Sequence, residues 1–275
     1  MGISLDKAKL NILADEVRAC GAYARQVQQN IHRDYKSDGT VITETDLEVS
    51  RRILDLVGRL FPDANIISEE TLTPWRDDAP CTFVLDPIDG TDVYSQGLPS
   101  WVVALGILDS TRTPVGAMID APRWGVGCDE LFVRLDPGAE HTLVNGRPLV
   151  LRGDKDTPTQ VTMGASGQQH VDFSRFHGKV RTFGSSIIHL LAPVIYPHFE
   201  ACVNQPCYVW DVASAHAVLL HEGMLMEYVD GSPFVYDDDF VLNRRQFKMP
   251  VYAGTRGCID YLQKNLPVRV TLGSL

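Results

Sequence analysis

The sequence predicts an α/β protein in which an α+β half precedes an α/β half. Two amphipathic helical patterns come first, a series of short strand-like runs follows, and beyond these runs strand-like and helix-like segments alternate. Helices followed by a run of strands are typical of α+β folds, whereas alternation is typical of α/β folds. Residues 134–156 are rich in Gly, Pro and Asp, so we expect the halves to span residues 1–145 and 146–275.

Two helices are expected at the start of the chain. For the first, apolar residues recur every three or four positions, as one buried helix face requires; they are Leu10, Leu13, Val17, Cys20, Ala24, Val27 and Ile31. A second helix is expected to begin at Thr45, because residues 45–48 (TDLE) have the form of a capping box. Pro62 closes it.

Short apolar runs bounded by turn residues predict the strands of the first half. They are residues 65–68, 81–85, 101–108, 115–119 and 130–134. In the second half we expect strands near Val161 and Val180 and over 199–203 and 224–229, helices over 185–196 and 211–221, and a final strand, helix and strand.

Composition excludes several classes of function. Among the 275 residues no apolar run approaches the roughly 18–20 that a membrane span needs. Residues 1–30 lack the core of a signal peptide, so a cytoplasmic location is expected. The formal charge of −10, with no Lys/Arg block, argues against a nucleic-acid partner. An acidic protein that acts on an anionic substrate needs cations to mediate, which points to bound metal.

The six cysteines predict neither a disulfide framework nor a zinc site. They include no CxxC pair, and most are expected to be small buried side chains; they are residues 20, 81, 128, 202, 207 and 258.

The chemistry of the chain centres on residues 86–91, DPIDGT, at the end of a predicted strand. Two aspartates and the Ile88 carbonyl offer the hard oxygen ligands that Mg²⁺ prefers. Each acidic motif also has an ordinary structural explanation. Asp-Pro and Asp-Gly are common turn dipeptides, Glu69-Glu70 could be a solvated pair, and Asp211 could be a helix N-cap.

Taken together, these motifs resemble the signature segments of the inositol monophosphatase family, in that family's order and separation. The three central segments are Glu69-Glu70, residues 86–91 and residues 210–213 (WDVA). Residues 36–46 (KSDGTVITETD) are similar to the family's lysine-to-TxxD segment, and residues 181–186 to its R-x-x-G-[ST] stretch. The resemblance extends from about Leu10 to Leu262.

The resemblance implies a layered αβαβα sandwich of the sugar-phosphatase type, a homodimer, inhibition by Li⁺ and a cofactor of two or three Mg²⁺ ions. The implied metal ligands are Glu70, Asp86, the Ile88 carbonyl, Asp89 and Asp211. The implied catalytic residues are Asp46 and Thr91, which orient or deprotonate the attacking water, and Glu70. The implied substrate-binding residues are Lys36, Asp89, Gly90, Thr91, Gly184, Ser185, Asn204 and Asp211.

The expected reaction is Mg²⁺-dependent hydrolysis of a small phosphate monoester, inositol 1-phosphate or a similar sugar or polyol phosphate. Asn204 stands seven residues before Asp211, where the family's inositol phosphatases carry a glutamate. Asparagine can form hydrogen bonds with hydroxyls, but it has no charge to form an ion pair with the cationic amine of histidinol phosphate. Histidinol phosphatase is one alternative function, and this residue does not favour it.

A 3′(2′),5′-bisphosphate nucleotidase is another alternative, because residues 210–218 (WDVASAHAV) are similar to that relative. His189, Tyr208 and Arg123 are candidates for the wall such a substrate needs. The non-enzymatic alternative is a regulatory or binding protein on a phosphatase scaffold.

Overall fold

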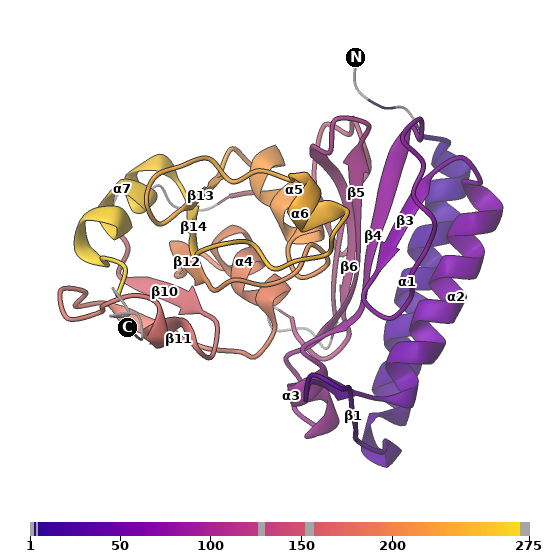
Figure 1. The fold of residues 1–275 in the computed structure, drawn as a ribbon, viewed down its shortest axis with the longest axis horizontal. Helices are drawn as coiled ribbons and strands as arrows, with labels where there is room; N and C mark the ends of the chain where they lie inside the picture. Colours follow the sequence, from indigo (N-terminus) through magenta and orange to yellow (C-terminus); the bar gives the residue numbers. More distant parts are fainter. Residues whose placement is uncertain (1–2, 4, 126–129, 152–156, 270–275) are drawn as a thin grey trace.

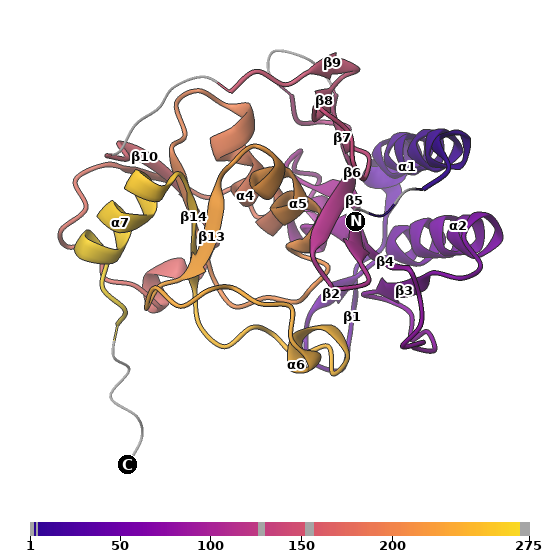
Figure 2. The same cartoon turned by 90° about the horizontal axis from the view of Figure 1, so that it is seen from above.

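The computed structural model describes residues 3, 5–125, 130–151 and 157–269. Within them five layers alternate in the order helix, sheet, helix, sheet, helix (Figures 1 and 2). The predicted αβαβα sandwich is therefore confirmed. In the described part of the chain no helix is both long and apolar enough to cross a membrane.

Helices α1 (Lys7–Val27) and α2 (Glu44–Leu60) form the first layer. The stripe of α1 is buried from Leu10 to Ala24, and a 3₁₀ turn, η1 (Gln28–Asn30), ends the helix before Ile31. The capping box of α2 lies two residues before the predicted one: Thr43 is the N-cap, and the Asp46 side chain accepts from its backbone N–H at 2.9 Å. The prediction from residues 45–48 was wrong in register, because a capping-box pattern also fits Thr43 and Asp46.

The first sheet has seven strands in sequential order. They are β3 (Asn65–Ser68), β4 (Cys81–Asp89), β5 (Val102–Asp109), β6 (Pro114–Ala121), β7 (Leu131–Leu135), β8 (Leu143–Val144) and β9 (Arg147–Pro148). Only β3 and β4 pair in parallel, since the other neighbours are joined as antiparallel strands. All of β4 is buried, and α2 packs against it.

Helices α4 (Ser186–Ile195) and α5 (Ala213–His221) form the middle layer between the two sheets (Figure 2). Nearly every residue of both helices is buried, as expected for helices with sheet on either side. The predicted start of α5 at Asp211 was wrong, since Val212 is its N-cap and Asp211 lies outside the helix.

The second sheet has the strand order β11-β10-β12-β14-β13 and carries α7 (Arg256–Asn265) on its outer face. Its strands are β10 (Gln160–Met163), β11 (Lys179–Arg181), β12 (Ala201–Asn204), β13 (Leu225–Tyr228) and β14 (Val251–Gly254). Small elements not predicted from the sequence are β1 (Asp34–Tyr35), β2 (Val41–Ile42), α6 (Asp238–Val241) and η2 (Gly167–Gln169). The short helix that the family resemblance implies at Gly90 and Thr91 is present as α3 (Thr91–Ser95).

Three other expectations have mixed outcomes. The predicted final strand is represented by one bridge between Val171 and Val268, and residues 270–275 lie outside the described residues. Five cysteines are free and buried, whereas Cys128 lies outside the described residues. The division at residues 145 and 146 stays a prediction; the first sheet extends to Pro148.

One buried carboxyl lies where α1 crosses the first sheet. Asp120 of β6 is 1% exposed, and its Oδ1 has no hydrogen-bond partner among the described residues. The pKa of Asp120 is raised to about 8, chiefly by burial and also by the nearby Glu130, while Arg18 opposes the shift. A side chain at Gly21 of α1 would collide with this carboxyl, because a Cβ there would lie 1.7 Å from Oδ2.

We expect Asp120→Asn to stabilise the protein at alkaline pH. The folded pKa of about 8 lies above the unfolded value of about 4, so wild-type stability is full below about pH 4 and falls as the pH rises to about 8. Compared with wild type, Asp120→Asn should raise the melting temperature by about 5 °C at pH 8 and by less at pH 5. Thermal unfolding at both pH values tests this, with the exposed Asp78→Asn as control; an equal change at both would contradict it.

Candidate functional site

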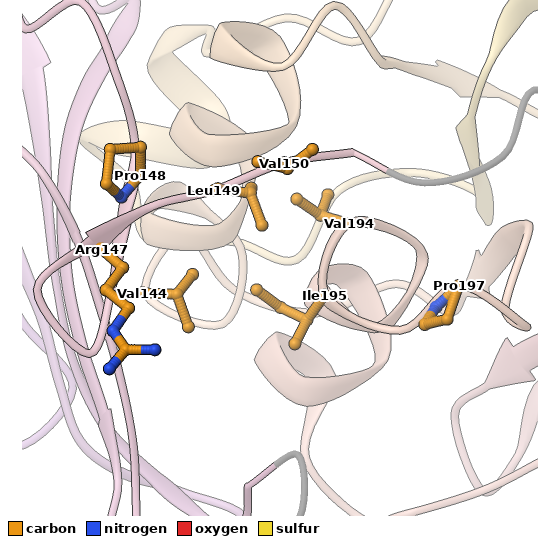
Figure 3. Close-up of a pocket in the computed structure, with 8 residues that line it drawn as sticks. All are labelled: Val144, Arg147, Pro148, Leu149, Val150, Val194, Ile195 and Pro197. Atoms are coloured by element: carbon orange, nitrogen blue, oxygen red, sulfur yellow. The ribbon is translucent and has the colours of Figure 1, made fainter.

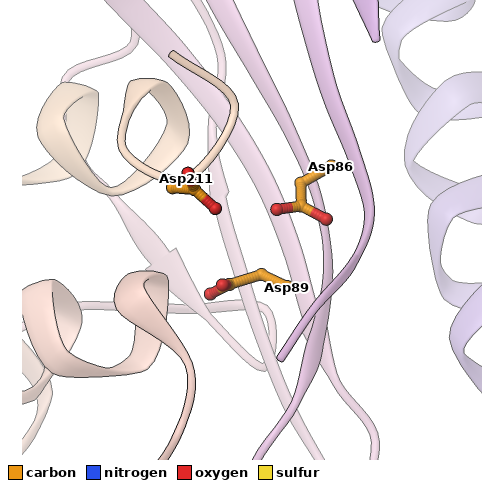
Figure 4. Close-up of side chains that lie close together, drawn as sticks. All are labelled: Asp86, Asp89 and Asp211. Atoms are coloured by element: carbon orange, nitrogen blue, oxygen red, sulfur yellow. The ribbon is translucent and has the colours of Figure 1, made fainter. Parts of the chain in front are cut away.

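Three carboxylates from both halves of the chain meet between the first sheet and the middle layer. Figure 4 shows Asp86, Asp89 and Asp211 turned toward one another. Each offers an oxygen within 4.8 Å of the others. The motif at the end of β4 and the WD segment are thus brought together.

An irregularity in β4 places the first two carboxylates. The register of β4 against β5 shifts between Asp86 and Asp89, which pair with Ala104 and Val102. A bulge changes the direction of side chains along a strand. Two aspartates three positions apart can therefore face one site, which regular alternation would not allow.

The third carboxylate is held by a tight turn before α5. The Tyr208 backbone N–H donates to Asp211 Oδ2 at 2.6 Å. Val212 is the N-cap of α5 and no side chain caps that helix, so the Asp211 carboxylate is not its cap. The N-cap alternative considered for Asp211 is wrong.

Asp89 also ties the two halves together. Its Oδ2 accepts from the Ile187 N–H at 2.7 Å and from the Ser185 hydroxyl, and its Oδ1 accepts from the Ser186 N–H at 3.2 Å. These donors belong to the N-terminus of α4, where free N–H groups and the helix dipole favour a negative charge. Ser185 is fully buried in this contact and does not line the cavity described below.

The cluster is electrostatically unfavourable as bare carboxylates. Burial raises the pKa of Asp86 well above its usual range, and Glu69 and Asp89 raise it further. Burial also raises the pKa of Asp211, with Asp89 and Glu69 adding to the effect. The pKa of Asp89 rises to about 6 through burial, because its donors offset only part of the cost.

A hard divalent cation fits this donor set. The Asp86 Oδ1 atom is buried and has no hydrogen-bond partner among the described residues. Carboxylate oxygens are the ligands that Mg²⁺ and Ca²⁺ prefer. A cation here would satisfy the unpaired oxygen and offset the repulsion within the cluster.

Glu69 rather than Glu70 reaches the cluster. Strand β3 runs parallel to β4 with Ser68 beside Leu85, so the next residue, Glu69, comes alongside Asp86. Glu69 lines the cavity, and Glu70 is not among its lining residues. Burial raises the pKa of Glu69 to about 7, although Lys36 opposes the shift.

Lys36 bridges the two glutamates. Its Nζ lies 2.7 Å from an oxygen of Glu69 and 2.7 Å from an oxygen of Glu70. Lys36 is not among the lining residues, so it contacts the acidic pair rather than the cavity. The same loop is held from the second half by Arg244, which donates to the carbonyls of Ser68 and Thr71 at 3.0 Å each.

Asp46 and Thr91 form a second polar group at the edge of the cluster. The Thr91 hydroxyl lies 3.1 Å from Asp46 Oδ1 and 2.9 Å from the Ile88 carbonyl. Burial raises the pKa of Asp46 to about 6, although its bonds to Thr43 oppose the shift. Gly90 directly precedes Thr91 and has a φ of 96°, a left-handed conformation that glycine adopts readily.

The carboxylate cluster opens onto a cavity of about 440 Å³. It is lined by Gly39, Thr40, Val41, Glu69, Asp86, Ile88, Asp89, Gly90, Thr91, Asp92, Gly184, Ser186, Gln205, Pro206, Cys207, Tyr208, Trp210, Asp211 and Gln246. A different pocket, of about 340 Å³ between the β8–β9 hairpin and the end of α4, is lined mainly by apolar side chains (Figure 3). It contains no carboxylate among its lining residues, so it lacks the ligand chemistry of the acidic cavity.

Sequence reasoning misplaced the residues on the substrate side. Asn204 is fully buried, with its amide against the Cys207 sulfur at 3.5 Å, whereas Gln205 and Gln246 line the cavity. His189 is buried elsewhere and accepts from the Phe183 N–H at 2.7 Å.

Of the three wall candidates, Tyr208 alone lines the cavity. Arg123 is bonded to the Gln28 amide oxygen at 2.6 Å. The spacing of seven before Asp211 identified the end of β12 but not which of its adjacent residues faces the site.

We expect divalent cations to stabilise the protein through the carboxylate cluster. In metal-free buffer, Asp86→Asn should raise the melting temperature, because it removes one buried charge from a repulsive group. Millimolar Mg²⁺ should raise the wild-type value by about 5 °C and the variant value by much less. Thermal unfolding with EDTA and with Mg²⁺ measures both effects, and Asp78→Asn is the exposed control. If Mg²⁺ did not change the melting temperature of the wild-type protein, the metal site would be contradicted.

Comparisons with known proteins agree with this fold. The model of the inositol monophosphatase family matches residues 10–257. The chain is 26% identical over 234 residues to the Nus factor SuhB of Pasteurella multocida, covering 79% of this chain and 84% of that protein. It is 24% identical over 212 residues to a fructose-1,6-bisphosphatase/inositol-1-monophosphatase of Thermotoga maritima, covering 74% and 77%.

A solved structure extends the likeness of the fold. The staphylococcal inositol monophosphatase-1 in an inhibitory complex soaked in 100 mM LiCl aligns with a TM-score of 0.77 at 13% identity, covering 96% of this chain and 97% of that one. At this identity the likeness concerns the fold alone.

Proposed function

We propose that this chain, which belongs to the inositol monophosphatase family and is a phosphoric monoester hydrolase, hydrolyses a small phosphate monoester in a Mg²⁺-dependent reaction. Inositol 1-phosphate or a similar sugar or polyol phosphate is the proposed substrate. The observation that carries the proposal is that the buried carboxylates of Asp86 and Asp89 meet the half-buried carboxylate of Asp211 beside Glu69.

The proposed ligands are the side chains of Glu69, Asp86, Asp89 and Asp211 and the carbonyl of Ile88. Glu69 takes the place that the sequence resemblance assigned to Glu70, because Glu69 lines the cavity beside Asp86. When bound, two or three Mg²⁺ ions would neutralise charge on the phosphate and lower the pKa of coordinated water.

The chain's own groups position water and phosphate. The Thr91 hydroxyl, held by Asp46 and the Ile88 carbonyl, offers a lone pair that orients a water molecule. Asp46, whose pKa is about 6, can accept a proton near neutral pH. The backbone N–H groups of Gly90 and Thr91, at the cavity wall, are proposed to donate to phosphate oxygens.

Homodimerisation, a cytoplasmic location and inhibition by Li⁺ are also proposed, on the family resemblance. A regulatory role is a second candidate because of the similarity to the Nus factor SuhB. The ligand set favours the enzyme: a purely structural scaffold has no need to keep mutually repelling carboxylates buried in one cavity.

Phosphate release tests the function directly. With Mg²⁺, we expect release from inositol 1-phosphate, no release with EDTA, and restoration when Mg²⁺ is added back. Histidinol phosphate, fructose 1,6-bisphosphate and adenosine 3′,5′-bisphosphate are assayed in parallel. If the protein released no phosphate from any of these esters although Mg²⁺ raised its melting temperature, the proposed enzymatic function would be rejected and the regulatory role favoured.

The two adjacent glutamates provide a matched pair of variants. Glu69→Gln should lower kcat/KM at least 100-fold, because it removes charge from a proposed ligand without changing its size. Glu70→Gln should lower kcat/KM less than tenfold, because that side chain bonds Lys36 outside the cavity lining. Steady-state kinetics with inositol 1-phosphate measure both. If Glu70→Gln lowered kcat/KM more than Glu69→Gln does, Glu70 rather than Glu69 would be the metal ligand.

A further inference from the structure

We infer that a second cavity, between the β5–β6 turn, α5 and β13, binds an uncharged planar aromatic molecule that carries one hydrogen-bonding group. The cavity measures about 510 Å³ and shares no lining residue with the acidic cavity. The inference therefore does not depend on the proposed hydrolysis. Small-molecule sites in proteins are typically concave and mostly apolar, with a few polar groups that fix the ligand.

Both halves of the chain shape this cavity. Residues 111–114 come from the β5–β6 turn and the start of β6, whereas residues 233–237 lead from β13 toward α6. Arg112 joins these two segments, since its Nη1 donates to Asp238 at 2.7 Å and to the Tyr236 carbonyl at 3.4 Å. The contact fixes the two rims of the cavity relative to each other.

Three aromatic rings form one corner of the cavity. The rings of His216 and Tyr236 are nearly parallel, at 16°, with centroids 5.7 Å apart. Phe234 stands across both, at 75° to His216 and 89° to Tyr236. Aromatic rings prefer to meet offset-stacked or edge to face. A planar ring in this corner can stack on one wall and present its edge to the other, which a non-planar ligand cannot do.

One polar atom of the lining lacks a partner. His216 is 5% exposed, and its Nδ1 lies 3.1 Å from the Tyr236 hydroxyl. Its Nε2 has no hydrogen-bond partner among the described residues but keeps contact with solvent, which places it at the cavity that His216 lines. Burial lowers the pKa of His216 to about 3, so the ring is neutral near pH 7. A neutral imidazole nitrogen can bond a ligand hydroxyl or N–H group.

The charged side chains of the lining are already compensated. Arg112 is paired as described above, and Glu227 accepts from the Arg256 guanidinium at 2.9 Å. Asp237 caps α6, where its Oδ1 accepts from a backbone N–H at 2.9 Å. A charged ligand would lose its hydration without gaining a free counter-charge. The wall therefore favours an uncharged ligand.

Aliphatic side chains form much of the remaining wall. They are Leu220 of α5, Leu225 and Met226 of β13, and Val235. Leu220 and Val235 are 39% and 49% exposed at the cavity. A ligand that covered them would remove apolar surface from water, which favours binding.

Three related molecules test the inference. The probe is 2-naphthol, which is planar, aromatic and uncharged and has one hydroxyl; 2-naphthoate adds a charge, and decahydro-2-naphthol removes the aromatic plane. Calorimetric titration of the full chain in Mg²⁺ buffer measures their affinities. We expect saturable one-to-one binding of 2-naphthol, and binding weaker by about tenfold for each of the other two.

Variants locate the site. His216→Phe keeps an aromatic ring but removes its nitrogens, so it should weaken binding of 2-naphthol by about tenfold. Leu220→Trp places a larger side chain in the cavity and should weaken binding by about as much; because Leu220 is partly exposed, this variant serves even if His216→Phe does not fold. Ile12→Trp adds the same ring at an exposed position on α1 and should leave the affinity unchanged.

Each outcome decides the inference. Absence of saturable binding of 2-naphthol would overturn it, and so would equal affinity for 2-naphthoate or decahydro-2-naphthol. An affinity for 2-naphthol that Leu220→Trp leaves unchanged would place the ligand elsewhere and also overturn it. Phosphate release plays no part in these measurements, so a failure of the proposed function would leave the inference standing.

Discussion

The packing of this protein is organised around several carboxylates that lie between the first sheet and the middle helical layer. Desolvating a carboxylate costs several kcal/mol unless donors or a cation compensate. Asp89 is compensated by the N-terminus of α4 and Asp211 by the turn at Tyr208, whereas Asp86 keeps an unpartnered oxygen. The compensation is therefore incomplete without a cation, which is the physical basis for assigning a metal site.

The same contacts hold the two halves together. Asp89 comes from the first sheet, and its donors come from the helix that separates the sheets. Arg244 links the second half to the loop that carries Glu69 and Glu70. The groups proposed to hold metal thus also set the relative position of the layers. The wall contributed by Gln205, Tyr208 and Gln246 comes from the second half alone.

Most of the architecture could be predicted because periodicity reports burial locally. The stripe of α1 and the apolar run of β4 each indicate which residues leave water, whereas the five-layer arrangement was implied by the resemblance to the inositol monophosphatase family. Short elements such as β1 and α6 were missed, since two to four residues carry too little periodicity. The register error at α2 has a similar origin: Thr43 and Thr45 both precede an acidic residue at the spacing of a capping box.

The kind of chemistry could be predicted from residue types alone, because the oxygen-rich segments around residues 69, 86–91 and 211 carry their ligand types wherever the chain places them. Only the tertiary structure decided which member of an adjacent pair faces the cavity. Glu69 faces it and Glu70 does not, and Gln205 lines it while Asn204 is buried against Cys207. Neighbouring residues in extended chain point to opposite sides. The choice between them therefore depends on register with a paired strand: β4 for the glutamates, and β14, distant in sequence, for the end of β12.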